Sequence, residues 1–176
     1  MKNITNPTLL LDEQKCKSNI RSMVHKTSEN NVSFRPHFKT HQSREIGRWF
    51  KEQGVSQITV SSVSMAEYFA SEWNDILIAF PVNILEIDDI NKLARQINLS
   101  LLVENVEAVE FLKKNLEHSV GFYIKIDAGY HRTGVDVANY ELIDHILQKA
   151  AESDKLRFIG FLTHAGHTYH AKSIEA

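Results

Sequence analysis

The sequence has little of several residue types that mark specialised classes of protein. It contains one cysteine, Cys16, so an internal disulfide is excluded and a cysteine-based metal cluster is not expected. Its three prolines and seven glycines form no linker-like cluster, which predicts no internal domain boundary. It also lacks a basic segment followed by a long apolar core, and its apolar runs are short. We therefore expect neither a signal peptide nor a membrane span.

The sequence has no strong charge of either sign. Twenty Lys and Arg residues oppose 22 Asp and Glu residues, for a net charge of -2. Such a balance provides no electrostatic footprint for nucleic acid or for an anionic membrane. The composition, 43% apolar and 24% charged, is that of an ordinary globular protein. We expect a cytoplasmic protein without nucleic-acid or membrane partners.

The sequence does contain an alternation of short, β-forming apolar runs with longer segments of helical periodicity. This alternation is typical of βα units and a parallel sheet. The predicted strands are residues 7–12, 32–39, 57–61, 75–80, 99–103, 120–127 and 156–164. The predicted helices are residues 13–28, 43–53, 64–71, 84–96, 106–116 and 138–152. Asp12 is placed to cap the first of these helices.

The number of strands favours a barrel. After the first strand and helix, six strands follow in series without a hairpin signal, whereas an eight-stranded barrel needs about 200–250 residues. We expect an α/β fold, a partial (β/α)8 TIM barrel with about six of eight strands present. Residues 1–176 would be the N-terminal portion of a larger barrel protein. A flavodoxin-like open sheet is the alternative.

Candidate chemistry is concentrated in residues 33–41. Alternate side chains of a strand face opposite sides, so this segment would carry an apolar face and a polar face. The apolar face consists of Phe34, Pro36 and Phe38, and the polar face of Arg35, His37, Lys39 and His41. Cationic and titratable groups in a barrel interior are costly unless an anion offsets them, and a phosphate-bearing cofactor at the mouth would do so. A lysine there could be a nucleophile when neutral. The alternative is a solvated surface strand.

Residues 35–41, Arg-Pro-His-Phe-Lys-Thr-His, are similar to the Arg-Pro-His-x-Lys-Thr-His signature of the D-threonine aldolase and D-serine dehydratase family. Further blocks that resemble this family are residues 6–12, 58–60, 66–67, 75–82, 125–135 and 163–169. The blocks keep their order and cover nearly the whole chain. Members resemble alanine racemases in fold, with a βα barrel that binds pyridoxal phosphate and a β domain formed largely from the C-terminus.

The resemblance implies that Lys39 binds pyridoxal phosphate through a Schiff base at the end of the first barrel strand. His37 is a further candidate for cofactor binding, although structural support is an equally open role for it. The resemblance also places Arg132 near the phenolic oxygen of the cofactor, with an ion pair to a loop aspartate as the alternative. Lys125 departs from the acidic residue common in relatives and is similar to a lysine of alanine racemases.

His164 ends the last predicted strand, and the resemblance implies that it lies near the cofactor ring. It is our second catalytic candidate after Lys39. His167 and Tyr169 would border the site and contribute to cofactor binding. The other histidines form no metal-ligand spacing, so we predict no metal ligand in this chain. The charge-rich residues 104–117 are interpreted as the solvated face of a helix.

The resemblance implies a pyridoxal-phosphate-dependent lyase for D-β-hydroxy amino acids, of the D-threonine aldolase or D-serine dehydratase type. A divalent metal (Zn, Mn or Mg) would be held by C-terminal residues of the full-length protein, which would be a homodimer. Because of Lys125, an amino-acid racemase of the same fold is an alternative. A non-catalytic carrier or regulatory protein that binds the cofactor is another, and an inactive fragment is a third.

Overall fold

The centre of the molecule is a parallel sheet, seen in a computed structural model that describes residues 5–8 and 10–173. Its strands are β1 (Ile58–Val60), β2 (Asp75–Pro81), β3 (Asn98–Val103), β4 (Val120–Asp127), β5 (Val135–Asp136) and β6 (Leu156–Thr163). β1, β2, β3 and β4 are neighbours in that order, and β6 pairs with the opposite edge of β4. Among the described residues, β5 pairs only with the last two residues of β4. All pairs are parallel, as βα repetition predicts.

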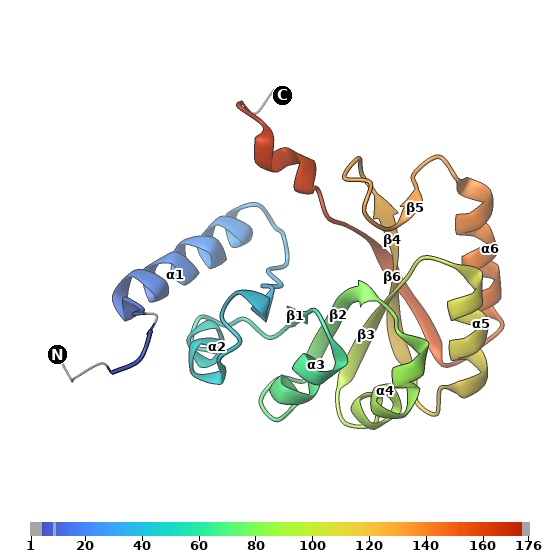
Figure 1. Ribbon diagram of the computed structural model, residues 1–176, viewed down its shortest axis with the longest axis horizontal. Helices are drawn as coiled ribbons and strands as arrows, with labels where there is room; N and C mark the ends of the chain where they lie inside the picture. Colours follow the sequence, from blue (N-terminus) through green and yellow to red (C-terminus); the bar gives the residue numbers. More distant parts are fainter. Residues whose placement is uncertain (1–4, 9, 174–176) are drawn as a thin grey trace.

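Helices connect the strands. They are α1 (Glu13–Glu29), α2 (Arg44–Lys51), α3 (Val63–Ala70), α4 (Ile87–Ala94), α5 (Val106–Asn115) and α6 (Tyr140–Ala151), with short 3-10 helices η1 (Phe38–Thr40), η2 (Ile84–Glu86) and η3 (Gly166–His170). Figure 1 shows α3, α4, α5 and α6 along the outer side of the sheet, whereas α1 stands at the other end of the molecule. No helix within residues 5–8 and 10–173 is long and apolar enough to cross a membrane.

Most helices begin at a capping side chain that their sequence supplies. The caps Asp12, Ser43, Ser62, Asn105 and Asn139 each accept a hydrogen bond from a backbone N–H of the first turn. Each such bond satisfies one of the donors that a helix leaves free at its start, and its loss typically costs about 1 kcal/mol. The predicted capping of α1 by Asp12 is thereby confirmed.

The main core lies between the outer face of the sheet and the helices. The strands contribute buried side chains such as Ile76, Leu99, Leu101 and Ile124, and the helices contribute Phe69, Ile90, Leu112 and Ile146. The helices cover only one face of the sheet with this core. The other face carries polar side chains toward the carboxyl ends of the strands, where βα folds build their sites.

Two predicted strands are wrong. Residues 7–8 and 10–12 are not in a strand, and Leu9 lies outside the described residues. Within residues 32–39 the only pairing with another described residue is an isolated bridge between His37 and Thr59. Pro36 has no N–H to donate, and its carbonyl accepts a single bond from Thr59 N–H at 2.8 Å, so no continuous ladder forms. The other five predicted strands are present, and β5 was not predicted.

Side-chain packing fixes η1 where the ladder does not. Phe38 is fully buried, and its ring lies 5.0–5.2 Å from the rings of Phe50, Phe69 and Trp73. A Cβ on Gly47 would come within 3.1 Å of the Phe38 ring, so the glycine lets α2 approach closely. The turn that carries Lys39 is therefore held by the helical layer.

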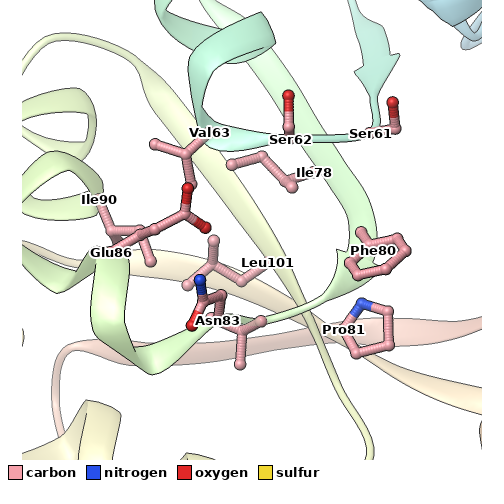
Figure 2. A pocket seen from close by; sticks show the side chains of 11 residues that line it. Ser61, Ser62, Val63, Ile78, Phe80, Pro81, Asn83, Glu86, Ile90 and Leu101 are labelled. Atoms are coloured by element: carbon pink, nitrogen blue, oxygen red, sulfur yellow. The ribbon is translucent and has the colours of Figure 1, made fainter.

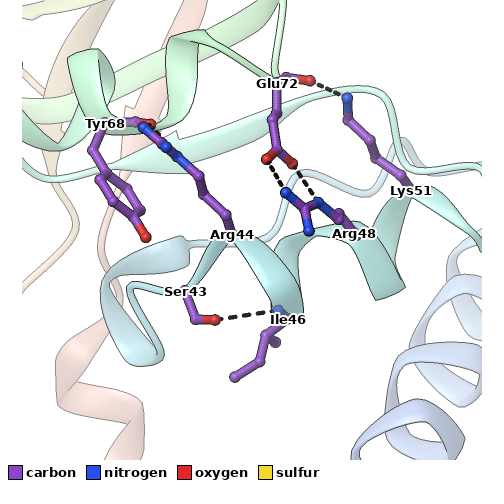
Figure 3. Close-up of polar contacts among 7 residues, drawn as sticks. All are labelled: Ser43, Arg44, Ile46, Arg48, Lys51, Tyr68 and Glu72. Atoms are coloured by element: carbon purple, nitrogen blue, oxygen red, sulfur yellow. Dashed lines mark hydrogen bonds and ion pairs between the residues drawn. The ribbon is translucent and has the colours of Figure 1, made fainter.

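Polar contacts tie α2 to the end of α3 (Figure 3). Arg48 donates two hydrogen bonds to the carboxylate of Glu72, at 2.6 and 3.1 Å. The Arg44 Nε–H donates to the carbonyl of Tyr68 at 2.8 Å, and Lys51 donates to the carbonyl of Glu72. Because these contacts are exposed, we expect them to fix the orientation of α2 and to contribute little to the free energy of unfolding.

Candidate active site

Several polar side chains follow the carboxyl ends of parallel strands and so meet at one edge of the sheet. Lys39 lies in η1 beside the end of β1, because the bridge of His37 to Thr59 places it there. Lys125 lies near the end of β4, and His164 follows β6. Arg132 is in the loop between β4 and β5. This edge is where parallel βα folds build their active sites.

The first part of this site is the η1 turn. The predicted alternation holds up to Lys39: Phe38 is buried, His37 is partly buried and Lys39 is exposed. His37 Nδ1 accepts a 3.3 Å hydrogen bond from Lys39 N–H, which orients the imidazole over the start of the turn. The amine of Lys39 is accordingly accessible at the mouth of the sheet.

His37 is held neutral by its surroundings. Burial, followed by the charge of Lys39 and by that of His164 in its protonated form, lowers the pKa of His37 to about 4. The influence of His164 on His37 means that residues more than a hundred positions apart in the chain act on one another here. His37 can accept a hydrogen bond at neutral pH but carries no charge.

His164 lies in a similar environment. Its pKa is lowered by burial and then by the positive charges of Arg132, Lys125 and Lys39. The structure therefore brings together the predicted residues Lys39, His37, Arg132 and His164.

The loop that carries Arg132 is built around Asp127. One carboxylate oxygen of Asp127 accepts hydrogen bonds from the N–H groups of Gly129, Tyr130 and His131, at 3.0–3.1 Å. These bonds, the one from His131 N–H foremost, lower the pKa of Asp127. Gly134 has φ +117°, and a Cβ there would lie 2.7 Å from the Asp127 nitrogen, so only glycine fits.

Arg132 does not form the ion pair that was the alternative for it. Within the described part of the chain it has no carboxylate partner, because Asp127 binds its own loop and His131. Its guanidinium lies over the ring of Tyr130, 5.3 Å from the centroid. The guanidinium donors are thus available to an anion at this edge.

The segment after β6 closes the other side of the site. The ring of His164 meets Tyr130 at 5.4 Å and Tyr169 at 5.9 Å, both nearly edge to face. His167 is exposed and lies beside Gly129, since a Cβ on that glycine would be 3.9 Å from its ring. Both predicted border residues therefore lie next to the Arg132 loop or His164.

Lys125 and Glu104 belong to this site, although neither was among the predicted site residues. Lys125 is only 5% exposed, and burial and the charge of Arg132 lower its pKa. Val103 is in register with Ile124, so Glu104 lies next to Lys125 on the neighbouring strand end. Glu104 is not on the solvated face of a helix as predicted, because α5 begins at Val106. One of its oxygens is buried without a hydrogen-bond partner in the part of the chain described.

Two residues of the polar face predicted for residues 33–41 lie elsewhere. His41 packs against Phe38, Phe50 and Phe69, because η1 turns the chain and ends the alternation. Arg35 forms a 2.8 Å ion pair with Asp75 at the start of β2, at the opposite end of the strands from Lys39. Both are structural here.

A separate hollow of about 200 Å³ lies between the ends of β1 and β2 and the starts of α3 and α4 (Figure 2). Its polar lining comes from Ser61, Ser62, Asn83 and Glu86, and the rest is apolar. None of the predicted site residues lines it. Within the described residues no group of three or more His, Cys, Asp or Glu side chains could hold a metal ion.

Comparison with known protein families identifies the family to which this fold belongs. The family described as alanine racemase, N-terminal domain, matches residues 11–175. The chain belongs to this family. The expected fold, a partial βα barrel of the alanine racemase type, is confirmed by that match and by the parallel sheet.

Several proteins that are similar to this chain are named as enzymes that act on D-amino acids. The chain is 29% identical to D-serine dehydratase of Dictyostelium discoideum, over 95% of this chain and 46% of that protein. It is 30% identical to D-threo-3-hydroxyaspartate dehydratase of Delftia sp. strain HT23, over 98% of this chain and 47% of the relative. The predicted resemblance to this group is therefore confirmed.

Solved structures of the same group share the fold. The Delftia dehydratase matches with a TM-score of 0.85, over 94% of this chain and 45% of that one. D-Threonine aldolase from Filomicrobium marinum, 24% identical, matches with a TM-score of 0.87 over 94% of this chain and 46% of that chain. The chain thus spans about half the length of the relatives that it matches.

Proposed function

We propose that this chain carries the Lys39 half of the active site of a pyridoxal-phosphate-dependent lyase that acts on D-β-hydroxy amino acids. The observation that carries the proposal is the accessible Lys39 amine at an edge of the sheet shared with Arg132, Lys125 and two neutral histidines. The names of the relatives, D-serine dehydratase and D-threo-3-hydroxyaspartate dehydratase, support the reaction class.

The residues present fit this cofactor. A lysine amine can hold its aldehyde, and Arg132 and the buried Lys125 supply positive charge for an anionic ligand. When bound, pyridoxal phosphate withdraws electrons from the α-carbon of an amino acid. His37, Tyr169 and His167 would border the same site.

The chain's own groups would then divide the remaining work. Arg132 would orient the cofactor or a substrate carboxylate, because its guanidinium is permanently charged and has no carboxylate partner in the described residues. The neutral imidazole of His164 could accept a proton and return it. The buried Lys125 would keep the positive charge of the site high.

Borohydride reduction in the presence of pyridoxal phosphate, followed by peptide mass spectrometry, tests this proposal. We expect a pyridoxyl adduct on Lys39 and none after Lys39→Ala, whereas Lys15→Ala on the exposed side of α1 should change nothing. A folded protein without an adduct at Lys39 would overturn the assignment. Release of ammonia or aldehyde from D-serine, D-threonine or D-threo-3-hydroxyaspartate would then identify the reaction.

An amino-acid racemase is the second candidate, and Lys125 is the observation that favours it. This lysine is buried beside Arg132, and alanine racemases share the family of the chain. Solvent deuterium entering the α-carbon without release of ammonia or aldehyde would favour racemisation over the lyase reaction.

A divalent metal would assist loss of the β-hydroxyl by polarising it. One solved structure of the Delftia dehydratase is a mutant described as being in the metal-free form, which supports a metal in that protein. Here we propose that the metal ligands belong to a C-terminal part of the full-length protein, which we propose is a homodimer.

A further inference from the structure

Tyr130 lies between the two groups that the proposed function uses on this side of the site. The Arg132 guanidinium is 5.3 Å from the centroid of its ring, and the His164 ring is 5.4 Å away at 87°. Arg132 belongs to the β4–β5 loop, whereas His164 follows β6. The ring of Tyr130 is therefore the direct contact between two separate segments of the chain.

The backbone opposite Tyr130 is shaped to admit this ring. A Cβ on Gly166 would lie 2.8–3.0 Å from three atoms of the Tyr130 ring, which is closer than real Cβ contacts. Gly166 is itself buried at the start of η3. The absence of a side chain at Gly166 thus allows Tyr130 to reach His164.

We propose that Tyr130 is a positioning residue whose ring holds Arg132 and His164 in one arrangement at the mouth of the site. The importance of that arrangement for catalysis rests on the proposed function, whereas the contacts themselves do not. The ring would hold the guanidinium by a cation–π contact and the imidazole by an edge-to-face contact.

No carboxylate in the described part of the chain is left to anchor these two groups, and the second ring that His164 meets, Tyr169, is farther away at 5.9 Å. Asp127, the nearest acidic residue of the loop, accepts three backbone N–H bonds and contacts His131. Neither Arg132 nor His164 has a carboxylate partner in the described part of the chain. A ring face holds a guanidinium without using its N–H donors, so Arg132 keeps them for a ligand anion.

The aromatic ring, and not the phenolic hydroxyl, would perform this role. Among residues 5–8 and 10–173, no hydrogen bond is made by the Tyr130 hydroxyl, and the side chain is partly exposed. Tyr130→Phe should therefore preserve the arrangement, whereas Tyr130→Leu should release both groups.

The experiment is an NMR titration of His164 in the whole chain with ¹³C-labelled histidine, which needs neither cofactor nor turnover. Burial and Arg132 lower the His164 pKa in the native arrangement, so releasing the ring contact should raise the titration midpoint. We expect this rise in Tyr130→Leu and in Gly166→Ala, whose Cβ displaces the ring. Tyr130→Phe should titrate like the wild type.

Tyr140→Leu is the matched control, because Tyr140 is an exposed tyrosine at the start of α6, outside the site. The proposal is overturned if Tyr130→Leu leaves the His164 midpoint where Tyr140→Leu leaves it. It is also overturned if Tyr130→Phe raises the midpoint as far as Tyr130→Leu does.

This test is separate from that of the proposed function. A missing pyridoxyl adduct on wild-type Lys39, with a titration shift in Tyr130→Leu, would sink the cofactor assignment but leave the positioning role. An adduct on Lys39 with no titration shift would do the opposite.

Discussion

At the mouth of the site, positively charged side chains outnumber carboxylates. Lys39, Lys125 and Arg132 all lower the pKa of His164, and Lys39 and His164 lower that of His37. A neutral imidazole can remain there at modest cost, whereas a charged one meets like charge and partial burial. The arrangement favours an anionic ligand, because the negative charge of such a ligand would offset the excess of positive charge.

At the residue scale, His37 should make stability depend on pH. Its pKa is about 4 in the folded protein against an ordinary value of 6.5, so the unfolded chain binds the extra proton between these values. The contribution of His37 to the free energy of unfolding is fully present above about pH 6.5. As pH falls toward 4, the free energy of unfolding should decrease by about 1–3 kcal/mol. Urea unfolding between pH 4 and 7 measures this loss.

His37→Gln should reduce the acid sensitivity without abolishing it, because burial also lowers the pKa of His41. His145→Gln, on an exposed position of α6, is the control and should leave the pH dependence unchanged. Equal acid sensitivity in His37→Gln and the wild type would contradict the prediction.

The sequence predicted the site residues that belong to local motifs and missed those defined by sheet register. Lys39, Arg132 and His164 each occupy a recognisable block, and the structure brings them to one edge. Glu104 and Lys125 are neighbours only because β3 pairs with β4 in one register, which periodicity does not specify. A search for polar residues at strand ends would have found Glu104.

At the element scale, the loop between β4 and β5 should depend on one carboxylate. Asp127→Ala removes the acceptor of three backbone N–H groups, so the amides of Gly129, Tyr130 and His131 should exchange with solvent roughly tenfold faster. Hydrogen-exchange NMR measures this change. Asp127→Asn keeps an acceptor oxygen and should be intermediate. Unchanged exchange in Asp127→Ala would mean that the loop is held by other contacts.

The η1 turn should depend on apolar packing and little on the surface ion pairs of α2. Phe38→Ala empties a site enclosed by three aromatic rings and should lower the free energy of unfolding by about 3–5 kcal/mol. Phe38→Leu should lower it less. Arg48→Ala breaks an exposed pair with Glu72 and should change unfolding little. Denaturant unfolding of the three variants checks this order. A larger loss of unfolding free energy in Arg48→Ala than in Phe38→Ala would contradict the prediction.

The predicted elements differ from the observed ones where local pattern conflicts with backbone chemistry. Residues 32–39 alternate as a strand should, yet Pro36 cannot donate to a ladder, and the segment forms one bridge. The same segment then enters η1, which turns His41 into the aromatic cluster. The short apolar runs of β2, β3, β4 and β6 carry no such conflict and were predicted.

At the scale of the whole molecule, β6 is an edge strand of the sheet, with one of its two sides unpaired in the described part of the chain. Among the described strands it pairs only with β4, and Phe158 and Phe161 on it are 40% and 55% exposed. An apolar hollow of about 400 Å³ borders Phe161 and Tyr140. Long apolar edges of this kind promote association between chains.

We therefore expect this chain to associate as its concentration rises, and Phe161→Lys to reduce that association. Sedimentation velocity over a concentration series measures it. Leu85→Lys adds the same charge at a more exposed position in η2 and should not reduce association. A cooperative melt of a monomer with bound pyridoxal phosphate would contradict the expectation.

The single bridge between His37 and Thr59 has a consequence for local opening of the fold. Lys39 is linked to the sheet by little backbone pairing but is packed through Phe38 against α2 and the end of α3. It should open and close with those helices as one cooperative unit, while β2, β3 and β4 stay closed. A ligand held at Lys39 would then protect α2 and α3 from proteolysis by mass action, without any need to contact either helix.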